Sequence, residues 1–410
     1  MSASEQTKAN IRNYYLSYNI SLVGTGLVGV FINVFFLATI GYIAVLYFQI
    51  ATWTITLVAY ILSGYLMRKY HPKYLYSAGL ILGIILLAVL LTVQSALSNV
   101  MVFGLIYGTS IGILYAGNNV VMYDITKGTN RTSFVAVNNL LGGIASLIAP
   151  VAAGVLIEFS PLPGVYKFLL DFVIASVFFV IAIFYIMKIK HRGKFRLSYS
   201  IRGTFIRAGK DYSKFNWYFI VSTIFGVGYS VIVPLYVFQT TGSYLITGIF
   251  AGFEVLVYTL TNFAFRKGFA EGRAFATYAV PALILSSLVL LIPKIIPPPI
   301  NAFIFSGLAT FFTTPLDNAV SVKYMKFLDR NKRINRALFW ANREYYLVIG
   351  RIAILAPMIL VACLVSTSTV FIALIPLLAF YSLIYYTIIK RGPIRLLGFA
   401  EAQPRDRTTE

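Results

Sequence analysis

The feature that most constrains this chain is the recurrence of long apolar stretches along almost its whole length. A helix needs roughly 20 residues to cross a hydrocarbon core of about 30 Å, and twelve stretches are at or near that length. They are residues 13–38, 40–66, 74–95, 99–123, 132–157, 164–188, 216–239, 244–265, 274–293, 300–322, 337–364 and 368–389. The sequence therefore predicts an all-α membrane protein with twelve transmembrane helices.

The positively charged residues support this count. Of the 34 Lys and Arg residues, thirty fall before, after or between the spans on one side of the membrane. Lys167 and Lys294 fall on the opposite side, and Arg343 and Arg351 lie inside a span. Because short loops rich in Lys and Arg stay on the cytoplasmic side, we expect a multi-pass protein of the cell membrane with both termini in the cytoplasm.

The same distribution explains the net charge of +21. On a soluble chain this charge would suggest a nucleic-acid partner. Here the basic loops face anionic lipid, so the expected partner is the bilayer and no nucleic acid.

Enzyme and metal motifs are absent from the sequence. The chain has one cysteine, Cys363, which excludes a disulfide within a monomer and a cysteine metal cluster. It has no Walker-type glycine loop and no Gly-x-Ser-x-Gly motif. We therefore expect no catalytic residues, no metal and no cofactor.

The chain divides near its middle, where the longest polar stretch between spans carries many cations. We predict an N-terminal six-helix bundle (1–188), a cytoplasmic basic linker (189–215), a C-terminal six-helix bundle (216–390) and a cytoplasmic polar tail (391–410). The two bundles are expected to be pseudo-symmetric.

Three matches between the halves support this symmetry. The motif Asn-Arg-x-x-Phe-x-Ala opens two spans, at Asn130 and again 205 residues later at Asn335. The other matches are Asn118-Asn119 with Asp317-Asn318, and Arg68-Lys69 with Arg266-Lys267. Parallel six-span repeats related by an axis along the membrane normal are typical of one large class of transporters.

The loop after the second span carries a resemblance to a known family. Its sequence from Gly64 to Lys73 is similar to Gly-x-Leu-x-Asp-[Arg/Lys]-x-Gly-[Arg/Lys]-[Arg/Lys], the signature of the major facilitator superfamily. Gly64, Leu66, Lys69 and Lys73 match, whereas Arg68 replaces the acid. The resemblance implies a monomeric transporter in which this loop is a gating motif, and the missing acid puts its usual latch between the halves in doubt.

The fifth span contains a second similarity. The run Ala145-x-x-x-Ala149-Pro150-x-x-Ala153-Gly154 resembles the pattern of the family's antiporters, with alanine at three glycine positions. The alternative interpretation is close packing of helices through small residues.

Polar residues inside the spans differ between the halves. The first half carries amides: Asn33, Asn118, Asn119, Asn138 and Asn139. At the repeat-equivalent places the second half carries Asp317 and the pair Arg343-Glu344. If the halves face each other, one wall of a central cavity is neutral and the other is ionic.

Five charged residues are expected to meet in one network. Glu254 lies about 15 Å into its span, and Arg351 is near the same depth, at about 1.5 Å of rise per residue. Glu344 lies seven residues before Arg351, on nearly the same helix face. With Asp317 and Arg343 they form a set of three acids and two bases that either binds substrate and a coupling ion or only ties three helices together. Near the opposite side of the membrane, Lys167 and Asp171 are expected to form a local salt bridge.

The predicted function is secondary active transport of a small solute by alternating access, coupled to protons through Glu254. A deep carboxylate among apolar residues can change its protonation state during such a cycle. Efflux by antiport is one direction. The alternatives are import of an organic anion or a sugar by symport, or lipid movement by a flippase or scramblase of the same fold.

Overall fold

The computed structural model describes residues 3–90, 97–126, 131–190, 209–264, 296–330 and 336–364. Every regular element in these ranges is helical. The helices are α1 (Ala3–Gly29), α2 (Phe31–Thr39), α3 (Tyr42–Leu66), α4 (Pro72–Leu90), α5 (Leu97–Ile125), α6 (Arg131–Glu158), the 3₁₀ turn η1 (Gly164–Phe168), α7 (Leu169–Met187), α9 (Gly209–Thr241), α10 (Tyr244–Ala264), α12 (Ile300–Arg330) and α13 (Arg336–Leu364).

The described helices fit the predicted spans. Within the described ranges, nine candidate spans are long and apolar enough to cross a membrane, and Ile300–Pro315 forms a shorter apolar segment. Together they account for every predicted span in the described ranges. The predicted spans 274–293 and 368–389, most of the linker and the tail 391–410 lie outside the described residues.

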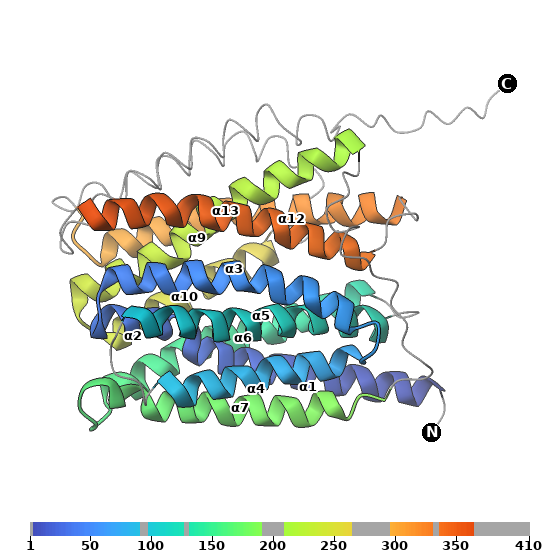
Figure 1. Ribbon diagram of the computed structural model, residues 1–410, viewed down its shortest axis with the longest axis horizontal. Coiled ribbons are helices and arrows are strands. Elements are labelled where there is room, and N and C mark those ends of the chain that lie inside the picture. The colour runs from blue at the N-terminus through green and yellow to red at the C-terminus, as the bar shows by residue number, and fades with distance from the viewer. Residues whose placement is uncertain are drawn as a thin grey trace.

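The helices pack side by side with their axes in one general direction (Figure 1). In this view α9, α12 and α13 lie at the top, whereas α1, α4 and α7 lie at the bottom. Large apolar side chains such as Leu140, Ile148, Val180 and Phe184 are exposed along the flanks. Such a surface suits lipid, because lipid tails solvate apolar side chains.

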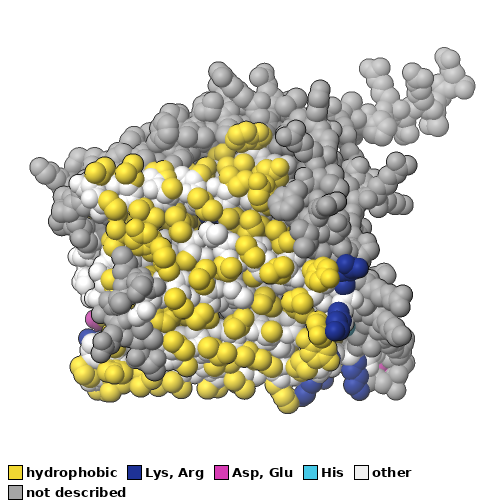
Figure 2. Space-filling model, in the orientation of Figure 1, with side chains coloured by type: hydrophobic (Ala, Val, Ile, Leu, Met, Phe, Trp, Pro, Cys, Tyr) yellow, Lys and Arg dark blue, Asp and Glu magenta, His cyan; other side chains and the backbone are white. Residues whose placement is uncertain are grey.

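Charge separates the two ends of the bundle. Figure 2 shows Lys and Arg side chains gathered at its right-hand end, which is where the N-terminus lies in Figure 1. We call this the basic end; it includes Arg68 and Lys69 between α3 and α4, and Lys73 in the first turn of α4. The opposite end, called the far end, contains the turn between α2 and α3 and the end of α6 at Glu158.

The turn between α2 and α3 at the far end is very short. Only Ile40 and Gly41 separate the two helices, and both backbone N–H groups donate to Phe36 O at 3.0 Å. Gly41 has a φ of 117°, in a region that residues with a Cβ avoid. The predicted first span is also divided, since α1 ends at Gly29 and α2 begins at Phe31.

In the described residues the two halves meet mainly along two helix pairs, α6 with α10 and α3 with α13, with a smaller contact between α2 and α9. The first pair packs backbone against backbone. A Cβ atom on Gly248 would lie 2.3 Å from Pro150 O, and one on Gly154 would lie 2.8 Å from Tyr244 O. Gly154 and Pro150 of the fifth predicted span therefore lie in the contact between the halves, whereas Ala149 of the same run packs against Gly26 of α1.

Candidate functional site

A cavity of about 340 Å³ lies between the halves. Its size is in the range of small-molecule sites in proteins. Leucine, valine and aromatic side chains make much of its wall, and Asn33, Gln49 and Thr52 form a neutral polar patch on the first-half side. Among the described residues that line it, Glu254 alone is charged.

Glu254 is surrounded by hydroxyl groups. It lies on α10, where Ser306 of α12 donates a hydrogen bond to Glu254 Oε1 at 3.0 Å. The Ser306 hydroxyl in turn lies 2.5 Å from the hydroxyl of Tyr229 on α9, which also lies 3.3 Å from Thr310 Oγ1. A carboxylate held only by hydroxyls can gain or lose a proton without breaking an ion pair.

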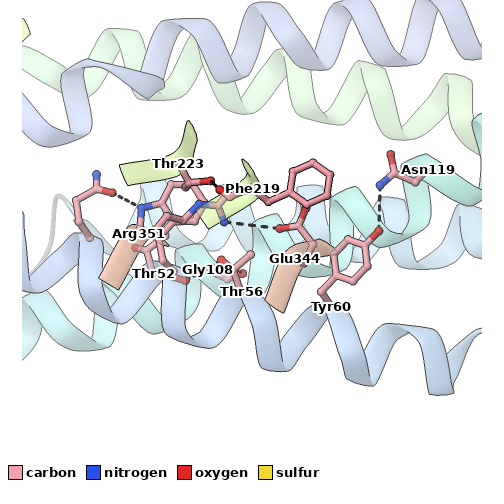
Figure 3. A network of polar contacts seen from close by, with 11 residues as sticks. Thr52, Thr56, Tyr60, Gly108, Asn119, Phe219, Thr223, Glu344 and Arg351 are labelled. Carbon is pink, nitrogen blue, oxygen red and sulfur yellow. Dashed lines mark hydrogen bonds and ion pairs between the residues drawn. The ribbon is translucent and has the colours of Figure 1, made fainter. Parts of the chain in front are cut away.

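A second polar group lies between α3 and α13. Arg351 Nη1 is 3.6 Å from Glu344 Oε2, and the two side chains are 14% and 15% exposed. The Arg351 guanidinium also lies 3.9 Å from the ring centroid of Trp53, a close cation–π contact across the two halves. Figure 3 shows this ion pair beside Thr52, Thr56 and Tyr60 of α3.

Hydrogen bonds extend this group into the first half. Trp53 Nε1 donates to Gln49 Oε1 at 2.8 Å, and Gln49 Nε2 donates to Asn33 Oδ1 at 2.8 Å. A continuous set of polar contacts therefore runs from Asn33 on α2 through α3 to Arg351 and Glu344 on α13. We call these five residues the cross-half chain.

The five charged residues expected in one network lie in different surroundings. Glu344 and Arg351 pair, as their seven-residue spacing indicates, but Glu254 faces α9 and α12. Asp317 is exposed and accepts a hydrogen bond from Tyr218 of α9. The Arg343 guanidinium lies over the rings of Phe219 and Trp340, at 5.5 and 5.3 Å from their centroids. Spacing along one helix predicts the pair on α13, but it does not specify which neighbouring helix each charged residue faces.

The four remaining predicted amides lie in the first half, and two of them form hydrogen bonds there. Asn118 accepts a hydrogen bond from Tyr14 at 2.9 Å, and Asn119 donates to Tyr60 at 3.0 Å, as Figure 3 also shows. Asn138 is buried and Asn139 is exposed. None of these four is among the described residues that line the cavity.

The predicted gating motif lies at the basic end. Gly64 is buried, and Arg68 and Lys69 are exposed, each over a tyrosine ring of the same segment. Lys73 Nζ donates to Met187 O at 3.3 Å and to Ile189 O at 2.9 Å, at the C-terminal end of α7. A cation there satisfies helix carbonyls and complements the helix dipole.

Two acids mark the far end. Glu158 Oε2 accepts hydrogen bonds from Tyr244 N at 2.7 Å, Leu245 N at 3.3 Å and Ser243 Oγ at 3.3 Å, so it caps the first turn of α10 from the other half. Asp171 is fully buried, and neither of its oxygens has a hydrogen-bond partner in the described part of the molecule. The expected salt bridge between Lys167 and Asp171 is not formed there, because burial of Asp171 in α7 removes it from the chain surface.

Sequence reasoning missed several residues of these groups. Gln49 and Trp53 are four apart on α3, and a lone glutamine in an apolar span was a usable signal. Ser306 and Tyr229 gave no signal, since serines and tyrosines are frequent along the spans. In the described residues no group of three or more His, Cys, Asp or Glu side chains could hold a metal ion.

Comparisons with known proteins agree with this architecture. A family profile described as Major Facilitator Superfamily matches residues 14–342. A relative from Bacillus subtilis (strain 168), Uncharacterized protein YqgE, is 26% identical over 238 residues, which are 56% of this chain and 53% of that protein. The matched region thus spans about half the length of that relative.

Solved structures of transporters are similar over nearly the whole chain. The nucleoside transporter NupG has a TM-score of 0.67 at 12% identity and covers 95% of this chain and 99% of its own. The peptide transporter POT has a TM-score of 0.66 at 13% identity, covering 93% and 94%. A bacterial homologue of the iron transporter ferroportin has a TM-score of 0.62 at 12% identity, covering 94% and 100%. At these identities the similarity is one of fold.

Proposed function

Since this chain belongs to the major facilitator superfamily of membrane transporters, we propose that it is a proton-coupled secondary transporter of a small solute. It is a transporter and not an enzyme. Transport proceeds by alternating access, in which the two halves rock around a central cavity. We propose that the basic end faces the cytoplasm of a cell membrane, with both termini on that side.

The main support for proton coupling is the position of Glu254. It is the one charged side chain among the described residues that line the cavity, and its described hydrogen-bond donor is the neutral Ser306. An acid in the membrane interior is costly, and such residues commonly mark ion or proton pathways. A solute in the cavity and a proton on Glu254 would therefore influence each other directly, which is what coupling requires.

The lining favours a neutral or cationic solute over an organic anion. Arg351 is paired with Glu344 and covered by Trp53, and neither Arg351 nor Arg343 lines the cavity. Trp53, Tyr107 and Tyr115 offer flat aromatic faces, and Glu254 offers a counter-charge. An amphipathic cation exchanged for a proton fits this wall, because the cation binds when Glu254 has lost its proton.

A second candidate is import of a neutral polyol or sugar with a proton. It is supported by the patch of Asn33, Gln49 and Thr52 in the cavity wall. Amide and hydroxyl groups can bond the hydroxyls of such a solute.

A binding experiment separates these candidates. Purified protein is heated with tetraphenylphosphonium, with a neutral sugar or with an aromatic carboxylate, at several pH values. We expect tetraphenylphosphonium to raise the melting temperature more as the pH rises, because deprotonated Glu254 attracts the cation, and we expect no such rise in Glu254→Gln. The matched control is Asp171→Asn, which neutralises a buried acid that does not line the cavity. Stabilisation by the carboxylate alone would contradict the proposed solute class.

Coupling is tested with the solute so identified. In vesicles containing Glu254→Gln, a pH gradient should no longer drive transport, whereas exchange of labelled for unlabelled solute should continue. The amide keeps the size of the side chain but cannot carry the coupling proton. Gradient-driven transport at the parent rate would show that Glu254 is not the coupling group.

A further inference from the structure

A second, smaller cavity lies on the other side of the hydroxyl groups around Glu254. It has a volume of about 80 Å³ and lies between α9 and α12, with Ser222, Tyr229, Thr310, Thr313 and Asp317 in its wall. A polar space of this size holds a few water molecules. Its wall is mostly hydroxyl-bearing, in contrast to the largely apolar wall of the central cavity.

The polar groups of α12 follow the helix period. Ser306, Thr310, Thr313 and Asp317 are spaced by four, three and four residues, so they share one face of the helix. This face turns toward α9, whose Tyr229 contacts Ser306 and Thr310. At about 1.5 Å per residue the row extends roughly 16 Å from Ser306 toward the basic end.

The contacts form a series from Glu254 to Thr310, and the small cavity separates Thr310 from the second acid, Asp317. Glu254 accepts from Ser306, Ser306 meets Tyr229, and Tyr229 meets Thr310. Tyr229 and Thr310 both line the small cavity, and so does Asp317. Asp317 is exposed on the molecular surface two residues beyond the apolar segment Ile300–Pro315, so the series runs from the central cavity toward a carboxylate on the basic-end side of that segment.

We propose that this series is a proton route between Glu254 and the medium at the basic end, separate from the path of the solute. The inference rests on the proposed coupling role of Glu254. Asp317 takes a proton from the medium and releases it to water molecules in the small cavity. These waters pass a proton on to the hydroxyl of Thr310. Each hydroxyl accepts a proton and releases its own, so that one proton arrives on Glu254 and no hydroxyl is changed. The reverse sequence of transfers returns the proton from Glu254 to the medium.

In the described part of the molecule, the side chains that contact the two acids of the route come from α9 and α12. Tyr229 of α9 is the titratable side chain that interacts with Glu254, and α12 presents the neutral Ser306 and Thr310 to the same site. Asp317 faces Tyr218 of α9. A route behind the binding site lets Glu254 exchange its proton while a solute fills the central cavity.

The test follows the protonation of Glu254 and needs no solute. The full-length protein is reconstituted in vesicles, and a pH step is applied at the basic end. Infrared difference spectroscopy then follows the protonated-carboxyl band that is absent in Glu254→Gln. We expect Tyr229→Phe and Thr313→Val each to slow the appearance of this band by at least about tenfold, since a positioned group in proton transfer is commonly worth more than that. Asp317→Asn should slow it as well.

The control is the neighbouring residue Thr314. Thr313 and Thr314 each donate to the carbonyl four residues earlier, at 2.9 and 2.7 Å, but only Thr313 is among the described residues that line the small cavity. Thr314→Val should therefore leave the rate unchanged. Equal slowing by both threonine variants, or parent rates in Tyr229→Phe and Thr313→Val, would overturn the route while leaving Glu254 as the coupling acid. If the parent protein shows no band that Glu254→Gln removes, both the coupling role and the route are wrong.

Discussion

The two contacts between the halves are built on different physical principles. Along α6 and α10 the helices touch through Gly154 and Gly248, where backbone packs on backbone. Along α3 and α13 the contact includes Trp53, Arg351 and Glu344, whose polar atoms are largely buried. The first contact depends on complementary shape, and its van der Waals attraction falls off steeply when the helices separate. The second depends on groups that can exchange partners, so it is the one suited to change during transport.

The largest expected effect comes from breaking the polar contact. Glu344→Gln leaves the Arg351 guanidinium largely buried without its carboxylate, and removing one partner of a buried pair costs about 3–5 kcal/mol. We expect a clearly lower melting temperature in detergent.

The double variant Glu344→Gln with Arg351→Met sharpens the result. It should recover most of the lost stability, because no uncompensated charge remains. If the double variant is stable and still transports, the pair is a brace between the halves. If it is stable and inactive, the pair takes part in the cycle. A parent-like melting temperature for Glu344→Gln alone would mean that the ion pair contributes little.

An intermediate effect is expected at the glycine contact. Gly248→Ala places a Cβ where it would be 2.3 Å from Pro150 O. Forcing extra atoms into a packed interface costs about 1–3 kcal/mol. The matched control is Gly226→Ala on α9, where a Cβ meets nothing within 4 Å. Similar melting temperatures for the two variants would contradict the close contact of α6 and α10.

The smallest expected effect is at Glu158, the charged residue at the end of α6 that contacts the start of α10. Glu158→Ala removes the acceptor for three donors at the start of α10. Loss of a helix cap typically costs about 0.5–2 kcal/mol. Hydrogen exchange at the first turn of α10 should accelerate while the rest of the helix is unchanged. Uniform acceleration over α10 would show that Glu158 supports the whole interface.

Much of the fold follows from hydropathy and charge. Most helices coincide with the apolar stretches, because each span is fixed by the length of the hydrocarbon core. At the basic end, α1 begins before its predicted span, at Ala3, and α12 continues beyond its span to Arg330. The division into spans 13–38 and 40–66 predicts a turn beside Ile40 and Gly41, whereas the break near Val30 was not expected, because it lies inside an uninterrupted apolar run.

The site is harder to predict from the sequence. Spacing on one helix places Glu344 near Arg351, but it cannot reveal that Trp53 of a distant span covers the pair. The repeat suggested that Asn118 and Asn119 face the cavity, whereas Tyr14 and Tyr60 hold them within the first half. Such partners depend on how helices rotate about their axes, which one sequence does not specify.

The connecting segments at the far end are short, and this limits what an antibody could recognise there. In the described part of the chain, α2 is followed by two residues, 40–41, and α9 by two, 242–243, before the next helix begins. The segment 159–163 is longer, and Phe159 is 72% exposed. It directly follows Glu158, which binds the first turn of α10. An antibody that binds the segment 159–163 would therefore have its epitope at the junction of the two halves, and its binding would distinguish one arrangement of the halves from another.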